Sequence, residues 1–484
     1  MGLAKVIAKA LVWTSLESFA LSGLSLISLV VFARLLTAEE FGVVAVGLAI
    51  VQLLTVPVEL TFHDALIQRA EVTSLHVDSA FTTSLTLGSA FCAACWLLAS
   101  TIERWVGQPG VGDVLRWMSL SLIGSGFGSV LVAMQRRKLE YRSLAIRSVI
   151  GRGGSAVVAL ALAFAGFGVW SLVVQQVLLV CLAAALLWVL ADERPRLRWA
   201  WAPTRELLRY GIFTTAYQLL VIFISRIYMV LVGAYLGAES AGVLSLCFRG
   251  VDMLRDLLAG AVSQIAMPLF SRLRETREQL FEAYDRALLL TTLCTFPVFA
   301  GLSVCAPEVI AFAFGPQWAE AAPYFAVIAL LAMEVFLRMY GATMLQAVGR
   351  PDTASVIVLA EVGCVVIGMF TVGQRSLRWA LAVWVVRLVI SVPIDIYLLK
   401  RVTGLGVARQ LKGAWLPMLA ATLMGAGVYL AKQRWLLGLA PTTRLWPMVA
   451  LGALLYAGTM WLIGKAHVVQ LWQFARHSLR RRAG

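Results

Sequence analysis

Charged residues are scarce in this sequence. Only 14% of its 484 residues are charged, whereas 60% are hydrophobic and the mean hydropathy is +0.84. A soluble protein of this length carries about a quarter charged residues and divides into several domains. Apolar runs of 18 or more residues recur instead, each long enough to cross a hydrocarbon core of about 30 Å. The composition excludes a soluble globular protein and predicts a polytopic membrane protein.

Histidine and loop cysteine are also scarce, which argues against metal, redox and disulfide chemistry. All seven cysteines lie in apolar runs; Cys92 and Cys95 have Cys-x-x-Cys spacing but lie mid-run with no histidine nearby, as expected of small buried side chains. No zinc spacing, phosphate-binding glycine loop or nucleophile motif occurs, so we expect no metal and no cofactor. Coupling to H+, to Na+ or to membrane potential alone stays open. The four histidines fall near the predicted inner side: His63, His76, His467 and His477.

A polar corner recurs between long apolar runs. In residues 34–43, Thr37 and Glu40 have the spacing of a capping box, so a helix should begin there. Residues 234–243 match this corner at five of ten positions, among them Gly42 with Gly242. Other landmarks recur about 210 positions apart. The sequence therefore predicts two homologous halves, an arrangement typical of transporters.

The apolar runs predict an all-α protein of about 14 transmembrane helices, arranged as six, six and two. The N-terminal lobe comprises residues 1–190 (spans 1–6), and a cytoplasmic linker, residues 191–209, joins it to the C-terminal lobe, residues 210–400 (spans 7–12). Two additional spans lie in residues 401–465, and residues 466–484 form a basic amphipathic cytoplasmic tail. The predicted spans are 10–33, 41–60, 79–102, 113–134, 144–166, 168–190, 210–235, 242–262, 286–306, 322–346, 354–374, 378–399, 415–431 and 446–464.

The net charge of +15 is largely a topology signal. With the N-terminus inside, 27 of the 41 lysines and arginines fall on the cytoplasmic side and eight on the other. This bias places both termini in the cytoplasm and makes a nucleic-acid partner unnecessary. The predicted partner is the lipid bilayer.

Six arginines remain inside spans, where a charge is costly and normally faces a bundle interior or a wet cavity. They are Arg152, Arg226, Arg249, Arg255, Arg338 and Arg387. The acids at similar depth are Glu17, Glu59, Asp252, Asp256, Glu334 and Glu361, with Asp395 near an inner end. The candidate coupling or cavity acids are Glu17, Asp252, Asp256, Glu334 and Glu361.

Two interpretations of these charges stay open. Arg249, Asp252 and Asp256 share one helical face, and Glu334 with Arg338 forms an i,i+4 pair, so the charges could simply neutralise one another. Arg226 and Arg387 have no acid three or four positions away and are the best candidates for binding an anion, unless Glu17, Glu59 or Glu361 pairs with them from a neighbouring helix. An arginine-rich cavity suits a phosphate-bearing substrate, because guanidinium binds phosphate through two parallel hydrogen bonds.

Short motifs in a fixed order give a resemblance to a known family over residues 5–430. They are Ala33–Thr37 with Glu40–Gly42, Ala65–Arg69, Asp78–Phe81, Gln135–Arg137 with Tyr141–Arg142, Gly166–Trp170, Pro268–Leu273, Gly315–Trp318 and Gly349–Pro351. In these the chain resembles the Wzx-type flippases, in the colanic-acid-exporter-like group of the multidrug/oligosaccharidyl-lipid/polysaccharide exporter superfamily.

The resemblance implies two pseudo-twofold-related lobes around a cavity that opens alternately to each side of the bacterial inner membrane. It implies as substrate an oligosaccharide repeat unit on undecaprenyl pyrophosphate, and as partners the polysaccharide polymerase and export machinery. Our hypothesis is that Arg226, Arg249, Arg338 and Arg387 receive the pyrophosphate, with Arg255 and Arg152 as further substrate-binding candidates in the cavity. Arg249 lies where the family tends to keep an arginine. Tyr228 lies where many relatives carry an aspartate, which puts a coupling role for that site in doubt.

Three other functions fit the sequence less well. A multidrug or organic-cation antiporter of the same superfamily needs unpaired carboxylates, whereas the unpaired deep charges here include arginines. A murein-precursor lipid flippase shares fewer of the motifs. A membrane enzyme such as a polysaccharide ligase or polymerase needs a sizeable outer loop, and no predicted loop exceeds about 24 residues. We therefore expect a flippase and not an enzyme.

Overall fold

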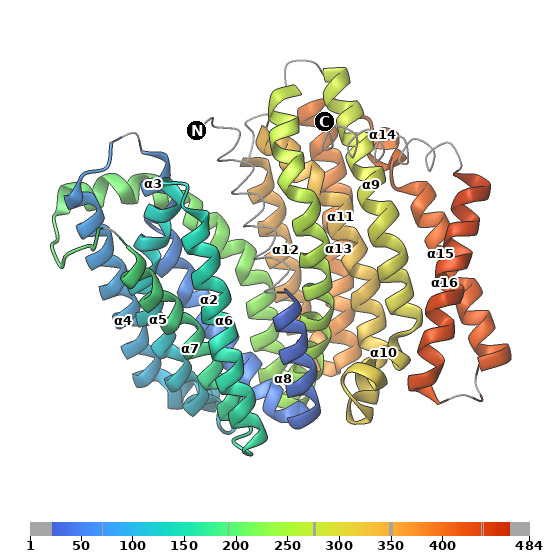
Figure 1. Cartoon of the computed structure of the whole chain (residues 1–484), viewed down its shortest axis with the longest axis horizontal. Helices are drawn as coiled ribbons and strands as arrows, with labels where there is room; N and C mark the ends of the chain where they lie inside the picture. Colours follow the sequence, from blue (N-terminus) through green and yellow to red (C-terminus); the bar gives the residue numbers. More distant parts are fainter. Residues whose placement is uncertain are drawn as a thin grey trace. The chain divides into compact units, whose positions relative to one another are not determined.

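The protein is all-helical, as the apolar runs predict (Figure 1). The computed structural model describes residues 22–69, 71–191, 193–273, 277–347, 352–436, 438 and 440–464, and no strand occurs among them. Ten helices in this part of the chain are long and apolar enough to cross a membrane, and two shorter apolar helices accompany them. The predicted tail, residues 466–484, lies outside the described residues.

Within the described residues, every predicted span corresponds to helix. The long helices are Ser22–Leu35, α2 (Ala38–Leu60), α4 (Ser74–Val106), α5 (Val111–Arg137), α6 (Tyr141–Phe164), α7 (Val169–Leu190), α8 (Trp201–Leu273), α9 (Arg277–Val304), α11 (Ala322–Ala347), α12 (Asp352–Thr371), α13 (Leu377–Thr403), α15 (Trp415–Ala431) and α16 (Pro441–Ile463). The sequence did not predict the short elements α3 (His63–Gln68), α10 (Ala306–Ala313) and α14 (Val407–Lys412), the 3₁₀ turns Pro316–Ala321 and Gly373–Arg375, or the π turn Lys432–Leu436.

The two copies of the polar corner end their helices differently. In the first, the Thr37 side chain accepts a hydrogen bond from the Glu40 amide at 3.2 Å and the Glu40 carboxylate accepts one from the Thr37 amide at 2.8 Å, which confirms the capping box. In the second, the predicted spans 210–235 and 242–262 both belong to α8, broken at Gly237. Gly237 has φ 92° and ψ 165°, a conformation that only glycine adopts at little cost.

The chain forms two compact units. The first comprises Met1–Met253 and Val358–Arg387, and the second Leu254–Ile357 and Leu388–Gly484. In the first unit α4 packs along α5, α6 along α7, and α5 against both α2 and α7. A Cβ at Gly88 would meet the carbonyl of Leu122, and one at Gly126 would meet that of Ser84, so these glycines allow the backbones of α4 and α5 to approach closely.

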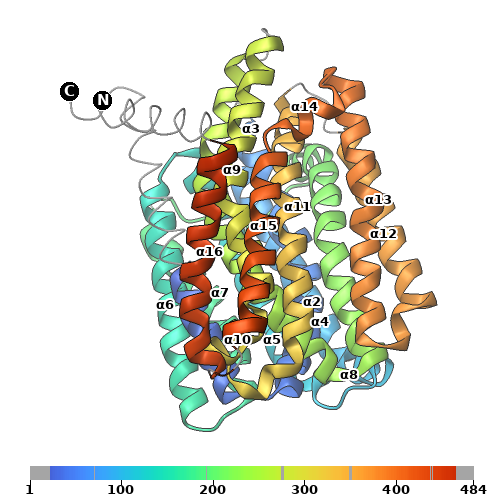
Figure 2. The same ribbon diagram turned by 90° about the vertical axis from the view of Figure 1, so that its right-hand side faces the viewer.

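The second unit includes the two appended helices. Figure 2 shows α15 beside α16, and α15 packs also against α9. Glu308 of α10 is buried, with 1% of its side chain exposed, and it forms ion pairs with Lys432 (2.9 Å) and Arg444 (3.2 Å). Because a buried charge without partners is costly, this pairing fastens α10 to the region where α15 ends and α16 begins.

Candidate functional site

Two of the predicted site arginines, Arg152 and Arg249, line one cavity inside the first unit. This arginine cavity has a volume of about 140 Å³. Arg152 of α6 donates a hydrogen bond to Ser25 Oγ at 2.8 Å. Arg249 comes from α8, and Gln175 and Gln176 of α7 complete the polar wall. Two guanidinium groups among neutral hydroxyls and amides make a cavity suited to an anion.

Arg226 is half-buried on the same helix as Arg249. Asp252 is near enough to interact electrostatically with Arg226, and Arg226 in turn acts on Arg249. Asp252 thus compensates part of the charge of Arg226. Arg226 is not among the residues lining the arginine cavity.

Arg387 has an acidic partner on another helix. Its Nη1 lies 2.6 Å from Glu361 Oε2 of α12, and both side chains are largely buried. The Arg387 guanidinium also stacks 4.2 Å from the ring centroid of Trp384. The partner on a neighbouring helix that the sequence left open is therefore present, which gives Arg387 and Glu361 a structural role.

An aromatic cluster surrounds the Arg387 pair. The Tyr228 and Trp384 rings lie 4.7 Å apart, and Phe248 meets both edge-on at 6.2 and 5.2 Å. Tyr228 is 1% exposed. At the position where the resemblance leads us to expect an aspartate, Tyr228 therefore places a buried ring beside a buried ion pair.

Arg338 is enclosed by carboxylates in the second unit. Glu334 lies 2.6 Å from Arg338, which confirms the predicted i,i+4 pair, and Asp395 of α13 forms a further ion pair with it. Ser391 Oγ accepts another hydrogen bond at 3.2 Å. With two acids around it, Arg338 leaves no excess positive charge among these three residues to attract a phosphate.

The remaining predicted site residues are dispersed. Arg255 pairs at 2.9 Å with the adjacent Asp256, whose side chain is 66% exposed. Such an exposed pair contributes little to stability. Glu17 lies outside the described residues.

The two repeated corners contact each other reciprocally within the first unit. A Cβ at Gly42 would collide with the carbonyl group of Ala238, and a Cβ at Gly242 with that of Ala38. Gln108 completes the contact: its Oε1 accepts from the Ala238 amide at 2.9 Å and its Nε2 donates to the Gly233 carbonyl at 3.1 Å. The sequence repeat is thus a paired contact in space, on the side predicted to face outward.

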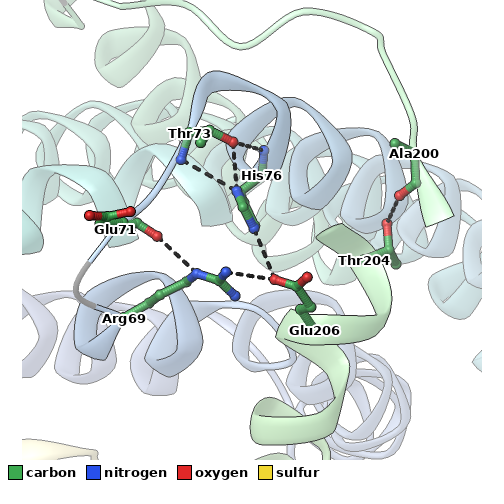
Figure 3. Close-up of polar contacts among 7 residues, drawn as sticks. All are labelled: Arg69, Glu71, Thr73, His76, Ala200, Thr204 and Glu206. Atoms are coloured by element: carbon green, nitrogen blue, oxygen red, sulfur yellow. Dashed lines mark hydrogen bonds and ion pairs between the residues drawn. The ribbon is translucent and has the colours of Figure 1, made fainter. Parts of the chain in front are cut away.

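On the predicted cytoplasmic side, a polar cluster fastens the start of α8 to the N-terminal helices (Figure 3). Arg69 lies 2.6 Å and His76 3.4 Å from the Glu206 carboxylate. Hydrogen bonds from Arg69 and then His76 hold the pKa of Glu206 below its usual value. The Asp78–Phe81 motif contributes too, because Asp78 accepts from the Arg196 amide and Ser79 from the Ala200 amide.

A second cavity was missed by sequence reasoning, which did not choose Glu59 as a site residue. This basic cavity has a volume of about 310 Å³ and lies inside the first unit. Its titratable and charged lining is Glu59, His63, Arg136, Arg147 and Arg152. Arginines near span ends were assigned to topology, so Arg136 and Arg147 gave no separate signal. A signal could have come from their positions, because Arg147 lies five residues before Arg152 on α6 and Arg136 lies at the end of α5, the preceding helix.

Comparison with known proteins identifies the family. The family described as "Polysaccharide biosynthesis protein" matches residues 31–323, more than half of the chain. The succinoglycan biosynthesis transport protein ExoT of Rhizobium meliloti is 28% identical over 68% of this chain and 66% of its own length, so the match spans slightly less than two thirds of that relative. The lipopolysaccharide biosynthesis protein WzxC of Escherichia coli is 22% identical over 84% of this chain and 83% of its own. The teichuronic acid biosynthesis protein TuaB of Bacillus subtilis is 21% identical over 94% of both chains.

Solved structures give the same fold. The lipid II flippase MurJ in an inward closed conformation superposes with a TM-score of 0.77, at 13% identity, over 94% of this chain and 100% of that one. An inward-facing multidrug resistance transporter of the MATE family gives 0.59 at 16% identity, over 84% and 94% of the two chains. Both are transporters and not enzymes. The chain has this transporter fold and belongs to the polysaccharide biosynthesis protein family, in the Wzx-type group that its motifs resemble.

Proposed function

We propose that the protein flips an oligosaccharide linked to undecaprenyl pyrophosphate across the bacterial inner membrane by alternating access. The observation that carries this proposal is the arginine cavity, in which Arg152 and Arg249 face neutral serines and glutamines. A sugar-pyrophosphate head cannot enter hydrocarbon unaided, because each stranded polar group costs several kcal/mol. In a polar cavity the two guanidinium groups replace the water lost from the phosphates.

Charge distinguishes the sites inside the protein. Arg387 is neutralised by Glu361, and Arg338 by Glu334 and Asp395. We assign the pyrophosphate to Arg249 and Arg152, because the described lining of the arginine cavity contains no carboxylate, and Arg226 with Asp252 tunes the field beside them. The relatives support the polymer class: their names refer to succinoglycan, lipopolysaccharide and teichuronic acid.

The reciprocal corner contact supports alternating access. Gly42 and Gly242 let the backbones of α2 and α8 meet without intervening side chains, which closes this end of the first unit tightly. With the predicted orientation, the closed end faces outward and the substrate enters from the cytoplasm. Separation of the same contact would release it outside.

The fold alone does not separate this function from transport of a cation or of a murein precursor. An organic cation would be repelled by Arg152 and Arg249, so the arginine cavity disfavours a drug antiporter. A murein precursor carries the same pyrophosphate lipid, but the sequence relatives reported above are named for polysaccharides and not for murein. The repeat-unit lipid is therefore the preferred substrate.

A flipping assay tests the proposal. Purified protein is placed in proteoliposomes with a fluorescent undecaprenyl-pyrophosphate oligosaccharide in both leaflets, and a membrane-impermeant reagent reports the accessible fraction. We expect access above the roughly half set by two leaflets for the wild type, and about half for Arg249→Gln, which loses a charged hydrogen-bond donor. Arg142→Gln removes the same charge from an exposed position of α6 and is the matched control. Normal flipping by Arg249→Gln would remove that residue from the site.

A further inference from the structure

The basic cavity of the first unit has no role in the site described so far. Its walls come from the ends of α2 and α3 and from α5, α6 and α7. Three arginines, one histidine and one glutamate face it, together with the hydroxyl groups of Ser125, Ser129 and Ser148. With His63 neutral, the lining has an excess of two positive charges.

The arginines form a series along the cavity. Arg136 lies in the last turn of α5, at the predicted cytoplasmic end. Arg147 and Arg152 are five positions apart on α6, so they lie about 7.5 Å apart along its axis. Arg152 lines both the basic cavity and the arginine cavity. The series therefore leads from the cytoplasmic end toward Arg249.

We propose that the basic cavity is a second phosphate-binding site, which receives a diphosphate group from the cytoplasmic side before that group reaches Arg249. This inference rests on the proposed flippase function and specifies how its substrate is loaded. Arginine matches phosphate oxygens through paired hydrogen bonds, and the Ser148 hydroxyl group in the lining can supply a further donor. Because Arg152 lines both cavities, it can bind the diphosphate group while that group moves from the basic cavity to the arginine cavity.

Glu59 regulates this site by competing with the anion. Ser125 Oγ donates a hydrogen bond to Glu59 Oε1 at 2.7 Å, which fixes the carboxylate in the wall of the cavity. His63, Arg136 and Arg147 are its charged or titratable neighbours. A carboxylate there lowers the local positive charge and so holds the affinity for phosphate at a level that permits release.

The test measures binding by full-length protein in nanodiscs. Native mass spectrometry follows occupancy by undecaprenyl pyrophosphate, and a parallel arm uses inorganic pyrophosphate as competitor. We expect Arg136→Gln and Arg147→Gln to weaken binding by about tenfold each, and Glu59→Gln to strengthen it severalfold. Arg147→Lys, which keeps the charge but cannot form paired hydrogen bonds, should weaken binding less than Arg147→Gln, and Ser148→Asp, which adds a negative charge to the wall, should also weaken it. Arg142→Gln, on α6 but outside the lining, is the matched control.

The outcomes separate this inference from the proposed function. If Arg249→Gln loses the lipid while Arg136→Gln and Arg147→Gln bind like Arg142→Gln, the loading site is wrong and the flippase proposal stands. If the wild type binds no pyrophosphate lipid, both proposals fail. If Arg136→Gln and Arg147→Gln weaken the binding of undecaprenyl pyrophosphate and of inorganic pyrophosphate equally, the cavity recognises the diphosphate itself. If they weaken the binding of inorganic pyrophosphate alone, the cavity holds a free phosphate and loading of the lipid is overturned.

Discussion

At the scale of single residues, the arginines inside the helices differ in the partners that the fold supplies. Arg387 lies against Glu361 and Trp384, whereas Arg249 faces neutral groups in the arginine cavity. Spacing along one helix revealed the Glu334–Arg338 pair but not Glu361, because that acid lies 26 positions away on α12. Burial beside neutral groups of the described lining, rather than burial alone, marks the arginine that is suited to an anion.

The Arg387 pair predicts a strongly non-additive double mutant. Arg387→Gln or Glu361→Gln alone leaves a buried charge uncompensated and should lower the free energy of unfolding by about 3 kcal/mol. The double variant removes both charges and should be destabilised by less than the sum. Unfolding of the purified protein in detergent measures this coupling. Additive losses would contradict an ion pair, and full flipping by the double variant would exclude Arg387 from substrate binding.

At the scale of elements, glycine decides where two helices meet. The corners of α2 and α8 approach through Gly42 and Gly242, and each would place a Cβ into the carbonyl of an alanine in the other corner. The start of α8 is held separately by Glu206, Asp78 and Ser79. The α8 helix is thus fixed at its start, on the predicted cytoplasmic side, and closely packed at its break.

Gly42→Ala should prevent the corners from closing. We expect flipping to fall by about tenfold, which corresponds to about 1.4 kcal/mol lost from the closed state. The proteoliposome assay measures it. Gly363→Ala, on α12 with no atom within 4 Å of the added Cβ, is the control and should flip normally. Normal flipping by Gly42→Ala would show that close approach at this corner is not needed.

The contact of Glu206 with Arg69 and His76 should protect the linker, residues 191–209, in a pH-dependent way. Since its pKa is lowered in the folded protein, the contact contributes stability at neutral pH, and this is lost only as the pH falls below the ordinary value of 4.5 and through the folded pKa. Glu206→Gln should therefore speed trypsin cleavage at Arg194–Arg198 severalfold at pH 7. Glu193→Gln, whose side chain is 82% exposed, is the control. In hydrogen exchange of linker amides, the difference between Glu206→Gln and wild type should shrink as the pH falls below 4.5 and disappear below the folded pKa. A difference that persists there would assign the protection to other groups.

At the scale of the whole molecule, outward movement of an anion is driven by the membrane potential. Two phosphate charges gain on the order of 5 kcal/mol from an interior-negative potential of about 100 mV. Imposing this potential on the proteoliposomes should shift the labelled lipid to the outer leaflet by up to roughly a few thousandfold at equilibrium. An unchanged distribution would mean that compensating charge moves with the substrate and would point to a coupled ion.

Hydropathy, charge asymmetry and the repeated corner were enough to predict the helices. The bilayer sets the length of each span and requires every backbone N–H and C=O group in lipid to form a hydrogen bond within its own segment, so both constraints act on the local sequence. The capping box at Thr37 and the pair Glu334–Arg338 were predictable for the same reason, because their partners lie within one helical turn. The predicted halves, linker and orientation stay predictions.

Only the tertiary structure decided which charges meet. It joined Arg387 to Glu361, placed Arg152 beside Arg249, and brought Glu59, Arg136 and Arg147 around the basic cavity. It also showed that Gly42 and Gly242 face each other's corners. Helix periodicity fixes the face on which a side chain lies, but not the neighbour that this face meets. That neighbour is chosen by packing between helices distant in sequence, so the spans followed from the sequence and the site from the fold.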